Sequence, residues 1–325
     1  MGLGDKLSVI AVATLAVWSM LLASNWTNRT PHLKGLKEAK SIIWVIAHPD
    51  DEAFFFGPSL TNLLAPPGRD EEKSKTVYPT GHILSLSSNY EGRGEVRTAE
   101  LKESCRMFAV DDDNCVVVND PRLVDGPDQT WSVDVINSIV AEKVKQWNAD
   151  VVCLLSHSPN LKRQGLNSDR SLQIITFDPL GVSSHPNHAS LGQTLLAAPS
   201  TFPQIYLVRT TPLPLKFTSL ILLPLKHLQH NIIPSSLIPF LPSLPGIGAI
   251  ASPSPRTVFL TSPPPSFILT RLAFDAHQSQ QTWFRTLYAL FSHYLWWIEL
   301  VPREEYELTR AAQVGRLIGE GKTEL

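Results

Sequence analysis

The stretch WVIAHPDDEAFFFG, residues 44–57, joins an apolar run to one histidine and three acidic residues. The apolar run is typical of a buried strand, and Asp51 and Glu52 lie where a following helix would begin. A buried strand that passes directly into a helix is the repeating unit of parallel α/β sheets. His48 and Asp50 would then lie at the carboxyl end of the strand, where such sheets bind ligands.

The chain beyond this stretch alternates apolar runs with helical patterns. We expect strands at 41–47, 82–88, 114–120, 150–155 and 173–178 and helices at 51–64, 94–110, 131–147 and 281–300. Strands that alternate with helices form a parallel sheet with helices on both faces. The predicted fold is therefore an α/β, Rossmann-like parallel-sheet sandwich.

Composition excludes some classes of protein. The 325 residues carry a net charge of -2, without the basic stripe that binding to a phosphate backbone requires, so we expect no nucleic acid partner. The three cysteines, Cys105, Cys115 and Cys153, are an odd number without metal-type spacing. They fit reduced thiols in the cytosol better than a disulfide framework.

An uncharged apolar segment occupies residues 7–24. As a helix it would cover ~27 Å of a hydrocarbon core about 30 Å thick, so we predict an N-terminal membrane anchor within residues 1–30. The alternative is a cleaved signal peptide, whose apolar core is usually shorter. Positive charges follow the segment, which places the body of the protein in the cytosol: Arg29, Lys34, Lys37 and Lys40. The sequons at Asn25 and Asn28 are then chance matches.

Residues 212–265 hold 12 of the 26 prolines, which excludes a regular membrane helix there. This segment is either a surface loop on the membrane interface or a poorly ordered insertion. The aromatic helix expected at 281–300 either packs on the core or forms an interfacial belt. Residues 303–325 are polar and predict a frayed tail.

Two clusters at strand ends carry the candidate chemistry. His48 and Asp51 are three residues apart and suit a divalent metal, with Asp50 placed to take a proton from a metal-bound water. The same acids could instead only cap a helix. A second cluster, FDPLGVSSHPNHASLG at 177–192, offers His185 and His188. One of these histidines would complete three protein ligands, the pattern of catalytic zinc, and the other would act on the substrate.

Four motifs resemble a known family: AHPDDEAFFFGPSL, SSNYEGRGEVRTAELKESC, TFDPLGVSSHPNHASL and HQSQQTWFRTLYALFSHY. In this order, over about 40–210 and 270–298, they are similar to the N-acetylglucosaminyl-phosphatidylinositol de-N-acetylases, the PIG-L branch of the LmbE-like deacetylases. The resemblance implies zinc held by His48, Asp51 and His188, and Asp50 as the general base. It also implies that His185 steadies the oxyanion, that Arg97 and Asp125 contact the sugar or phosphoinositol, and that His277 has a role not yet defined.

The reaction implied by the resemblance is zinc-dependent removal of acetate from N-acetylglucosaminyl-phosphatidylinositol (GlcNAc-PI) at the cytosolic face of the endoplasmic reticulum membrane, the second step of glycolipid-anchor synthesis. Other divalent metals are compatible with the ligands. The alternatives are a deacetylase of a soluble N-acetylglucosaminide and a non-catalytic lipid-binding or scaffold homologue. Lipid chain preference, partner subunits and oligomeric state are left open.

The chain departs from the family pattern at two places. Residues 156–173 interrupt what is normally one strand, so they are either a polar loop or non-coding sequence retained by a faulty gene model, and we expect 174–177 to be the strand in the sheet. Ser184 replaces the usual glycine, so a positive φ there would cost about 1 kcal/mol or more.

Overall fold

A computed structural model describes residues 31–68, 76–157, 172–231 and 256–308 of the chain. Within these residues a seven-stranded sheet has the order β3-β2-β1-β4-β5-β7-β6. The parallel strands are β1 (Ser41–Ile46), β2 (Thr80–Ser85), β3 (Cys115–Val117), β4 (Leu172–Phe177) and β5 (Gln204–Val208). The antiparallel strands β7 (Trp297–Pro302) and β6 (Val258–Thr261) extend the sheet beyond β5. The order 3-2-1-4-5 is that of doubly wound α/β folds, which confirms the α/β class. The sheet is mostly rather than wholly parallel, because β6 and β7 are antiparallel.

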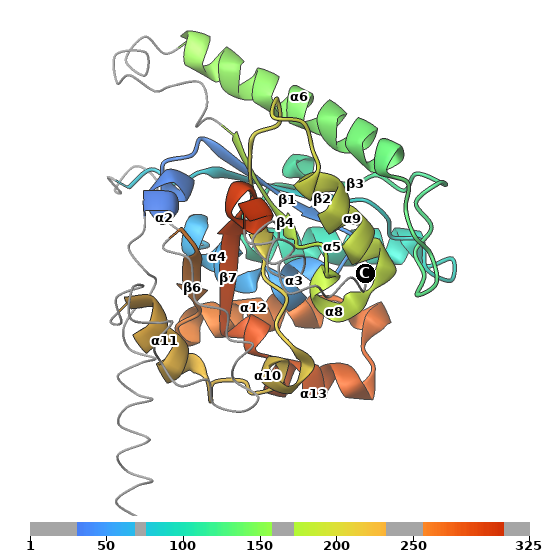
Figure 1. Cartoon of the computed structure of the whole chain (residues 1–325). Helices are drawn as coiled ribbons and strands as arrows, with labels where there is room; N and C mark the ends of the chain where they lie inside the picture. Colours follow the sequence, from blue (N-terminus) through green and yellow to red (C-terminus); the bar gives the residue numbers. More distant parts are fainter. Residues whose placement is uncertain (1–30, 69–75, 158–171, 232–255, 309–325) are drawn as a thin grey trace, which may run out of the picture.

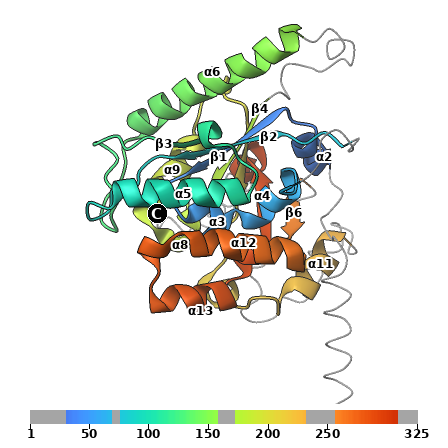
Figure 2. The ribbon, with the colours of Figure 1, turned by 180° about the vertical axis from the view of Figure 1, so that it is seen from behind.

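Helices cover both faces of the sheet (Figures 1 and 2). On one face α6 (Val133–His157) packs against α9 (Pro186–Leu196). On the other, α12 (Pro264–Ala276) packs against α3 (Asp51–Phe55), α4 (Gly57–Leu63) and α5 (Gly94–Met107). Other α-helices in the described residues are α2 (Pro31–Lys37), α8 (Gly181–Ser184), α10 (Leu213–Lys216), α11 (Leu223–Asn231) and α13 (Trp283–Phe291).

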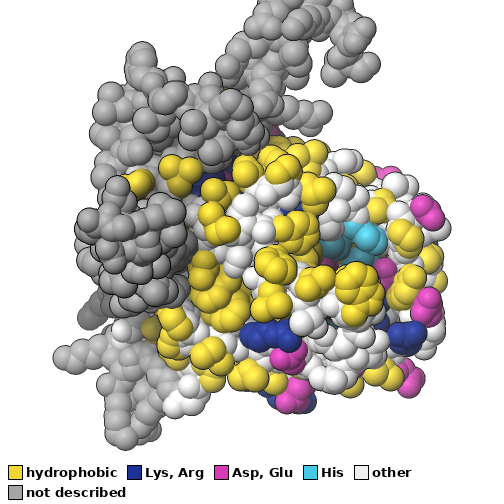
Figure 3. All heavy atoms as spheres, turned by 90° about the horizontal axis from the view of Figure 1, so that it is seen from below, with side chains coloured by type: hydrophobic (Ala, Val, Ile, Leu, Met, Phe, Trp, Pro, Cys, Tyr) yellow, Lys and Arg dark blue, Asp and Glu magenta, His cyan; other side chains and the backbone are white. Residues whose placement is uncertain are grey.

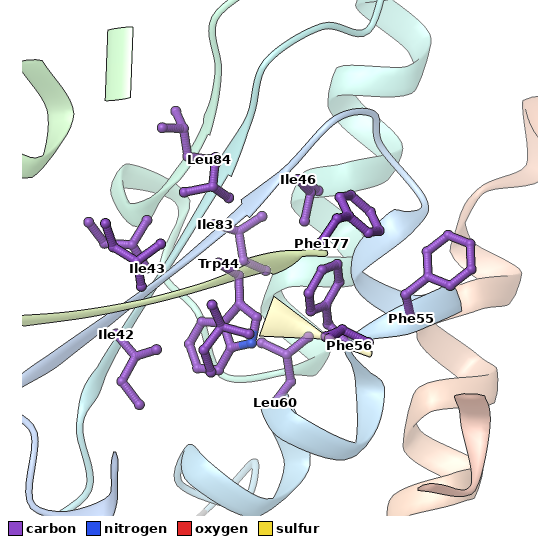
Figure 4. Packing of buried hydrophobic residues seen from close by; sticks show 14 of the residues in the cluster. Ile42, Ile43, Trp44, Ile46, Phe55, Phe56, Leu60, Ile83, Leu84 and Phe177 are labelled. Atoms are coloured by element: carbon purple, nitrogen blue, oxygen red, sulfur yellow. The ribbon is translucent and has the colours of Figure 1, made fainter. Parts of the chain in front are cut away.

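The core centres on β1, every residue of which is buried. Ile42, Trp44 and Ile46 lie among side chains from β2, β4 and α4, as Figure 4 shows. The indole nitrogen of Trp44 donates to Ser59 Oγ at 2.9 Å, so the polar atom of this buried side chain has its partner. A strand buried on both faces explains why residues 41–47 form a continuous apolar run rather than an alternating one.

Two predicted elements are wrong. Residues 150–155 are not a strand, because α6 continues to His157; no glycine or proline interrupts 133–157, so nothing stops the helix. The strand in the sheet is β4, as expected for 174–177. The helix predicted at 281–300 ends at Phe291, where Ser292 takes an extended conformation, and residues 297–302 form β7. The apolar run in β7 is buried in the sheet, and this favours a strand.

The cysteine prediction is also wrong for one pair, since Cys105 and Cys115 form a disulfide that ties the end of α5 to the start of β3. The cysteines therefore no longer support a cytosolic position. That orientation now depends on the flanking charges alone.

Several predicted segments lie partly or wholly outside the described residues. The apolar segment 7–24 lies outside, as does most of 156–173. Among the residues that the structure describes, no helix has both the length and the apolar character needed to cross a bilayer. The proline-rich segment contributes α10, α11 and β6, and 232–255 lie outside. Residues 303–308 are helical, and the rest of the predicted tail lies outside the description.

Candidate metal and active site

The two predicted clusters meet at one edge of the sheet. Strands β1 and β4 are parallel neighbours, with Trp44 opposite Ile175, so their carboxyl ends lie side by side. His48 follows β1, and His185 and His188 follow β4 around α8 and α9. All three histidines line a cavity of about 660 Å³ whose wall is completed by α13 and the start of α5.

Three side chains converge on one point of this cavity. His48 Nδ1 lies 3.4 Å from His188 Nε2. The carboxylate of Asp51 lies 3.2 Å from His188 Nε2 through Oδ1 and 4.0 Å from His48 Nδ1 through Oδ2. Ligands about 2.0–2.2 Å from one zinc ion at tetrahedral angles are separated by roughly 3.3–3.6 Å. The distances from His188 Nε2 to His48 Nδ1 and to Asp51 Oδ1 are close to this value, whereas the distance from Asp51 to His48 is longer and involves the other oxygen, Oδ2.

Hydrogen bonds on the outer side of each ring fix the donor atoms. His48 Nε2 lies 3.1 Å from Asp125 Oδ1 and 3.0 Å from Asn187 Oδ1, both acceptors, so Nε2 carries the proton. His188 Nδ1 lies 3.2 Å from the carbonyl oxygen of Gly181 and is likewise the protonated nitrogen of the neutral ring. Both inward nitrogens then offer lone pairs beside a carboxylate. A positive charge between them, either a metal ion or a proton on His188, would satisfy this buried set of electron donors.

The Asp51 carboxylate is held in place by the backbone. Its Oδ2 accepts from the amide nitrogens of Ala47 at 3.0 Å and His48 at 2.9 Å. Burial lowers the pKa of His48 to about 3, so this ring is neutral at physiological pH. The pKa of His188 is raised, because the Asp51 carboxylate outweighs the opposing effect of burial. The Asp51 carboxylate therefore favours a positive charge between the His48 and His188 rings.

His185 offers a second combination, because His48, His185 and His188 each bring a ligand atom within 4.8 Å of the others. The local hydrogen bond argues against His185 as a ligand. Its Nδ1 accepts from the amide nitrogen of Asn187 at 3.3 Å, which leaves the proton of the neutral ring on Nε2. Burial and the neighbouring His188 lower the pKa of His185, so the ring is neutral and able to donate. In this tautomer His185 Nε2–H can donate a hydrogen bond to a substrate.

Asp50 has an unusual backbone conformation at the start of α3. Its φ is 113°, in the left-handed region that non-glycine residues rarely occupy. The amide nitrogen of Asp50 donates to Glu52 Oε2 at 3.0 Å, which stabilises this turn. Strained residues of this kind cluster at functional sites, where the surrounding structure holds them. The turn places Asp50 in the cavity wall beside Asp51.

Glu52 links the turn to two distant helices. Its Oε1 lies 2.6 Å from His277 Nε2 and accepts from Ser104 Oγ of α5 at 2.6 Å. Burial lowers the pKa of His277, but the Glu52 carboxylate outweighs this effect and raises it, which favours the charged imidazole in this buried contact. His277 is thus a support for the turn that carries Asp50, which gives a structural role to a residue whose role the motif left undefined.

Arg97 and Asp125 are brought together rather than spread along a substrate groove. Arg97 Nη1 donates to Asp125 Oδ2 at 2.5 Å, and both side chains are buried. Asp125 also orients His48, as described above. Both residues still line the cavity. The Arg97–Asp125 pair therefore holds the outer nitrogen of His48 in place. Only part of the Arg97 and Asp125 side chains remains open to a ligand in the cavity.

The turn before α9 has three residues with positive φ: Gly181, Val182 and Ser184. Ser184 has a φ of 62°, as the replacement of a glycine led us to expect. Lys216 Nζ of α10 donates to the carbonyl oxygen of Val182 at 2.6 Å and anchors the strained turn. This turn sets the position of His185 and His188.

Three residues important for the site were missed by sequence reasoning: Arg285, Glu52 as a bridge, and Asn187. Arg285 Nη2 of α13 lies 2.5 Å from Asp50 Oδ2. Arg285 lies inside the quoted HQSQQTWFRTLYALF motif and Asn187 inside HPNH. The only signal for either was membership in a motif, because the pattern of apolar residues says nothing about polar partners.

Comparison with known proteins gives consistent results. Residues 43–199 match the family model described as PIG-L, GlcNAc-PI de-N-acetylase. The chain is 28% identical over 295 residues to the N-acetylglucosaminyl-phosphatidylinositol de-N-acetylase of Bos taurus, covering 87% of this chain and 92% of that protein. It is 28% identical over 194 residues to a probable enzyme of the same name from Schizosaccharomyces pombe, covering 58% of this chain and 65% of that protein.

Among solved structures, the N,N'-diacetylchitobiose deacetylase from Pyrococcus horikoshii aligns with a TM-score of 0.46 and 14% identity. The alignment covers 83% of this chain and 86% of that chain.

Proposed function

We propose that the chain is a PIG-L-type enzyme, a metal-dependent amide hydrolase that removes acetate from GlcNAc-PI in the second step of glycolipid-anchor synthesis. The match of residues 43–199 to the PIG-L family model and the similarity to the Bos taurus enzyme support this proposal. In this proposal residues 40–300 form the catalytic domain, residues 1–30 are a membrane anchor, and 303–325 are a tail. The domain would work on the cytosolic face of the endoplasmic reticulum membrane. Zinc is the proposed metal, since two imidazole nitrogens and one carboxylate are ligands that it accepts.

One observation carries the proposal. The inward nitrogens of His48 and His188 and the carboxylate of Asp51 lie 3.2–4.0 Å apart in a buried position. Three protein ligands with room beside them in a cavity are the arrangement of catalytic rather than structural zinc. A divalent cation bound there supplies Lewis-acid polarisation of an amide carbonyl and lowers the pKa of water.

Asp50 has the role of general base in this proposal. Its carboxylate lines the cavity next to the ligand Asp51. The pKa of Asp50 is lowered because Arg285 and Arg97 outweigh the effect of burial, so the carboxylate is ionised and able to accept the proton of an attacking water.

His185 acts on the other side of the scissile amide. Its Nε2–H donates a hydrogen bond to the oxygen of the tetrahedral adduct and keeps its proton. The departing amine takes the proton that Asp50 removed from the attacking water, which returns Asp50 to its carboxylate form. The half-buried position of His185 on the cavity wall allows contact with a ligand. Arg97 and Asp125 are proposed to contact the sugar with the part of their surface that faces the cavity.

The test is acetate release by the purified full-length chain from GlcNAc-PI in lipid vesicles, before and after removal of metal with a chelator. Loss on chelation and recovery with zinc support the proposal. A second substrate, the same glucosaminide-inositol phosphate without acyl chains, distinguishes a deacetylase of soluble sugars. If the metal-loaded chain releases no acetate from either substrate, the scaffold alternative holds instead.

A further inference from the structure

Helix α13 has two sides with opposite character. Its inner side faces the cavity, where Phe284, Arg285 and Tyr288 form part of the wall. Its outer side is apolar: five of its nine residues are exposed large hydrophobic side chains, namely Trp283, Phe284, Leu287, Leu290 and Phe291. Trp283 is 78% exposed. An exposed apolar patch of this kind on a protein surface marks an interaction site.

The patch continues onto the segment after α10. The ring of Phe217 lies 5.9 Å from that of Tyr288, and the amide nitrogen of Ser219 donates to the carbonyl oxygen of Phe291 at 2.8 Å. Phe217 and Ile221 are both exposed. We call the seven residues the α13 face: Phe217, Ile221, Trp283, Phe284, Leu287, Leu290 and Phe291.

The α13 face adjoins the mouth of the cavity. Figures 1 and 2 both place α13 at the lower end of the described part of the chain, opposite α6, and Figure 1 shows α10 beside α13. Seen from below, hydrophobic side chains gather in the middle of the surface and histidine side chains appear in a hollow beside them (Figure 3). Phe284 belongs to both features, because it lines the cavity and is itself exposed.

The face carries no charge that would favour a polar partner. Arg285 is the only charged residue of α13, and it points inward to Asp50. Tryptophan and phenylalanine beside leucine on one side of a short helix are typical of segments that lie in the interfacial layer of a bilayer. A second feature agrees with this, since the apolar run 7–24 ends only a few residues before α2 and would keep the domain close to a membrane.

From these observations we infer that the α13 face inserts into the surface of a lipid bilayer and holds the mouth of the cavity against it. The inference depends on the proposed function, because a phosphatidylinositol substrate keeps its acyl chains in the bilayer while its sugar enters the cavity. Docking by α13 shortens the distance that the sugar must rise from the membrane. The occupant of the face is thus the lipid itself rather than a protein.

The first experiment uses the full-length chain with Leu287→Gln and Leu290→Gln. The matched control is Val77→Gln with Val133→Gln, which also replaces two exposed apolar side chains but lies away from α13, before β2 and at the start of α6. Turnover of GlcNAc-PI in phosphatidylcholine vesicles should fall by at least about tenfold in the α13 variant and stay within about twofold in the control. Turnover of the substrate without acyl chains should be the same in all three proteins.

The second experiment needs no turnover. Wild type and Trp283→Phe are mixed with vesicles that contain brominated phosphatidylcholine, and tryptophan fluorescence is recorded. The difference between the two proteins isolates Trp283, whose emission should be quenched by the bromine atoms.

The outcomes separate the inference from the proposed function. Equal vesicle turnover in the α13 variant and its control, with no quenching of Trp283, overturns the inference even if the enzyme is active. A dimeric wild type that becomes monomeric in the α13 variant, by light scattering, also overturns it, because a second copy then covers the face. If Trp283 is quenched but acetate is released only from the substrate without acyl chains, the proposed function fails and the docking surface stands.

Discussion

Arg285 Nη2 of α13 lies 2.5 Å from Asp50 Oδ2, so a helix near the end of the chain is joined to the turn after β1. The guanidinium also lies 4.9 Å from the ring centre of Phe54, which holds it over α3. Burial alone would raise the pKa of Asp50, but Arg285 and then Arg97 lower it. The ion pair keeps the proposed general base ionised in a cavity that would otherwise favour its neutral form.

Replacing Arg285 by glutamine should shift the pH dependence of acetate release. Without the guanidinium the pKa of Asp50 rises, and activity requires the ionised carboxylate, so the acid limb of kcat/KM should move to higher pH. Arg285→Lys keeps the charge and should move the limb less. An acid limb that is identical in wild type and Arg285→Gln would contradict the assignment of Asp50 as base.

Replacing Asp50 by asparagine should remove the base and keep the metal. We expect kcat to fall by about 10²–10⁴, the usual contribution of a general base. Metal content, measured by mass spectrometry of the purified protein, should match wild type because Asp50 is not a ligand in the proposed set. Loss of metal together with activity would show that Asp50 coordinates it.

The two ligand sets permitted by the geometry predict different metal contents. If His48, Asp51 and His188 bind the ion, Asp51→Asn should weaken metal affinity by at least about tenfold, since a neutral amide replaces a charged oxygen. His185→Gln should keep the metal and lower turnover. The reverse result would assign the ion to the three histidines. Zinc titration with a competing chelator measures both affinities.

Glu299→Gln should destabilise the fold in a pH-dependent manner. Glu299 Oε1 lies 2.6 Å from Lys226 Nζ and 2.8 Å from His230 Nε2, and removing its charge leaves the buried Lys226 without its ion pair. We expect a loss of about 3–5 kcal/mol in the free energy of unfolding at neutral pH.

The sign of the pH dependence follows from the pKa of Glu299. Burial would raise this pKa, but Lys226 and Arg209 hold it well below its usual value of 4.5. The stability contributed by Glu299 is therefore fully present above about pH 4.5 and lost as pH falls through the lower folded-state pKa. The difference between wild type and Glu299→Gln in urea unfolding should shrink only below pH 4.5. The exposed Glu307→Gln is the control and should change little.

Gly192→Ala should destabilise the chain through one close contact. A Cβ at this position of α9 would lie 2.1 Å from the carbonyl oxygen of Asp178, and backbone cannot move as easily as a side-chain end. We expect a loss of about 1–3 kcal/mol or more in the free energy of unfolding. Gly35→Ala in α2 meets nothing within 4 Å and should stabilise by about 0.5–1 kcal/mol. Equal thermal shifts in both variants would refute the steric argument.

Residue periodicity predicted the alternation of strands and helices, and it failed where two signals compete. The run at 150–155 is apolar enough for a strand, yet these residues continue helix α6, which has no interruption before His157. Residues 297–300 were predicted as the end of the helix at 281–300 because Trp283 to Tyr294 set a helical period, but pairing with β5 and β6 makes them part of strand β7. A short apolar run can form either a helix or a strand, and the elements that pack around it in the folded protein determine which one forms.

The meeting of the two clusters could be predicted because each one follows a strand of the sheet. His48 and Asp51 come from one turn and His188 from another, and neighbouring parallel strands bring the two turns to one edge. The supporting contacts could not be predicted in the same way. Glu52 and His277 are 225 residues apart, and nothing local to either residue indicates the other.

The sequence by itself determined the parallel α/β architecture and the two turns that carry the candidate ligands, because strand–helix alternation and the spacing within a turn are properties of consecutive residues. Only the tertiary structure decided that Arg285 faces Asp50, that Asp125 orients His48, and that none of the described residues covers the outer side of α13. These relationships depend on how α12, α13 and α5 pack around the end of β1, and such packing is a property of the whole chain rather than of any segment.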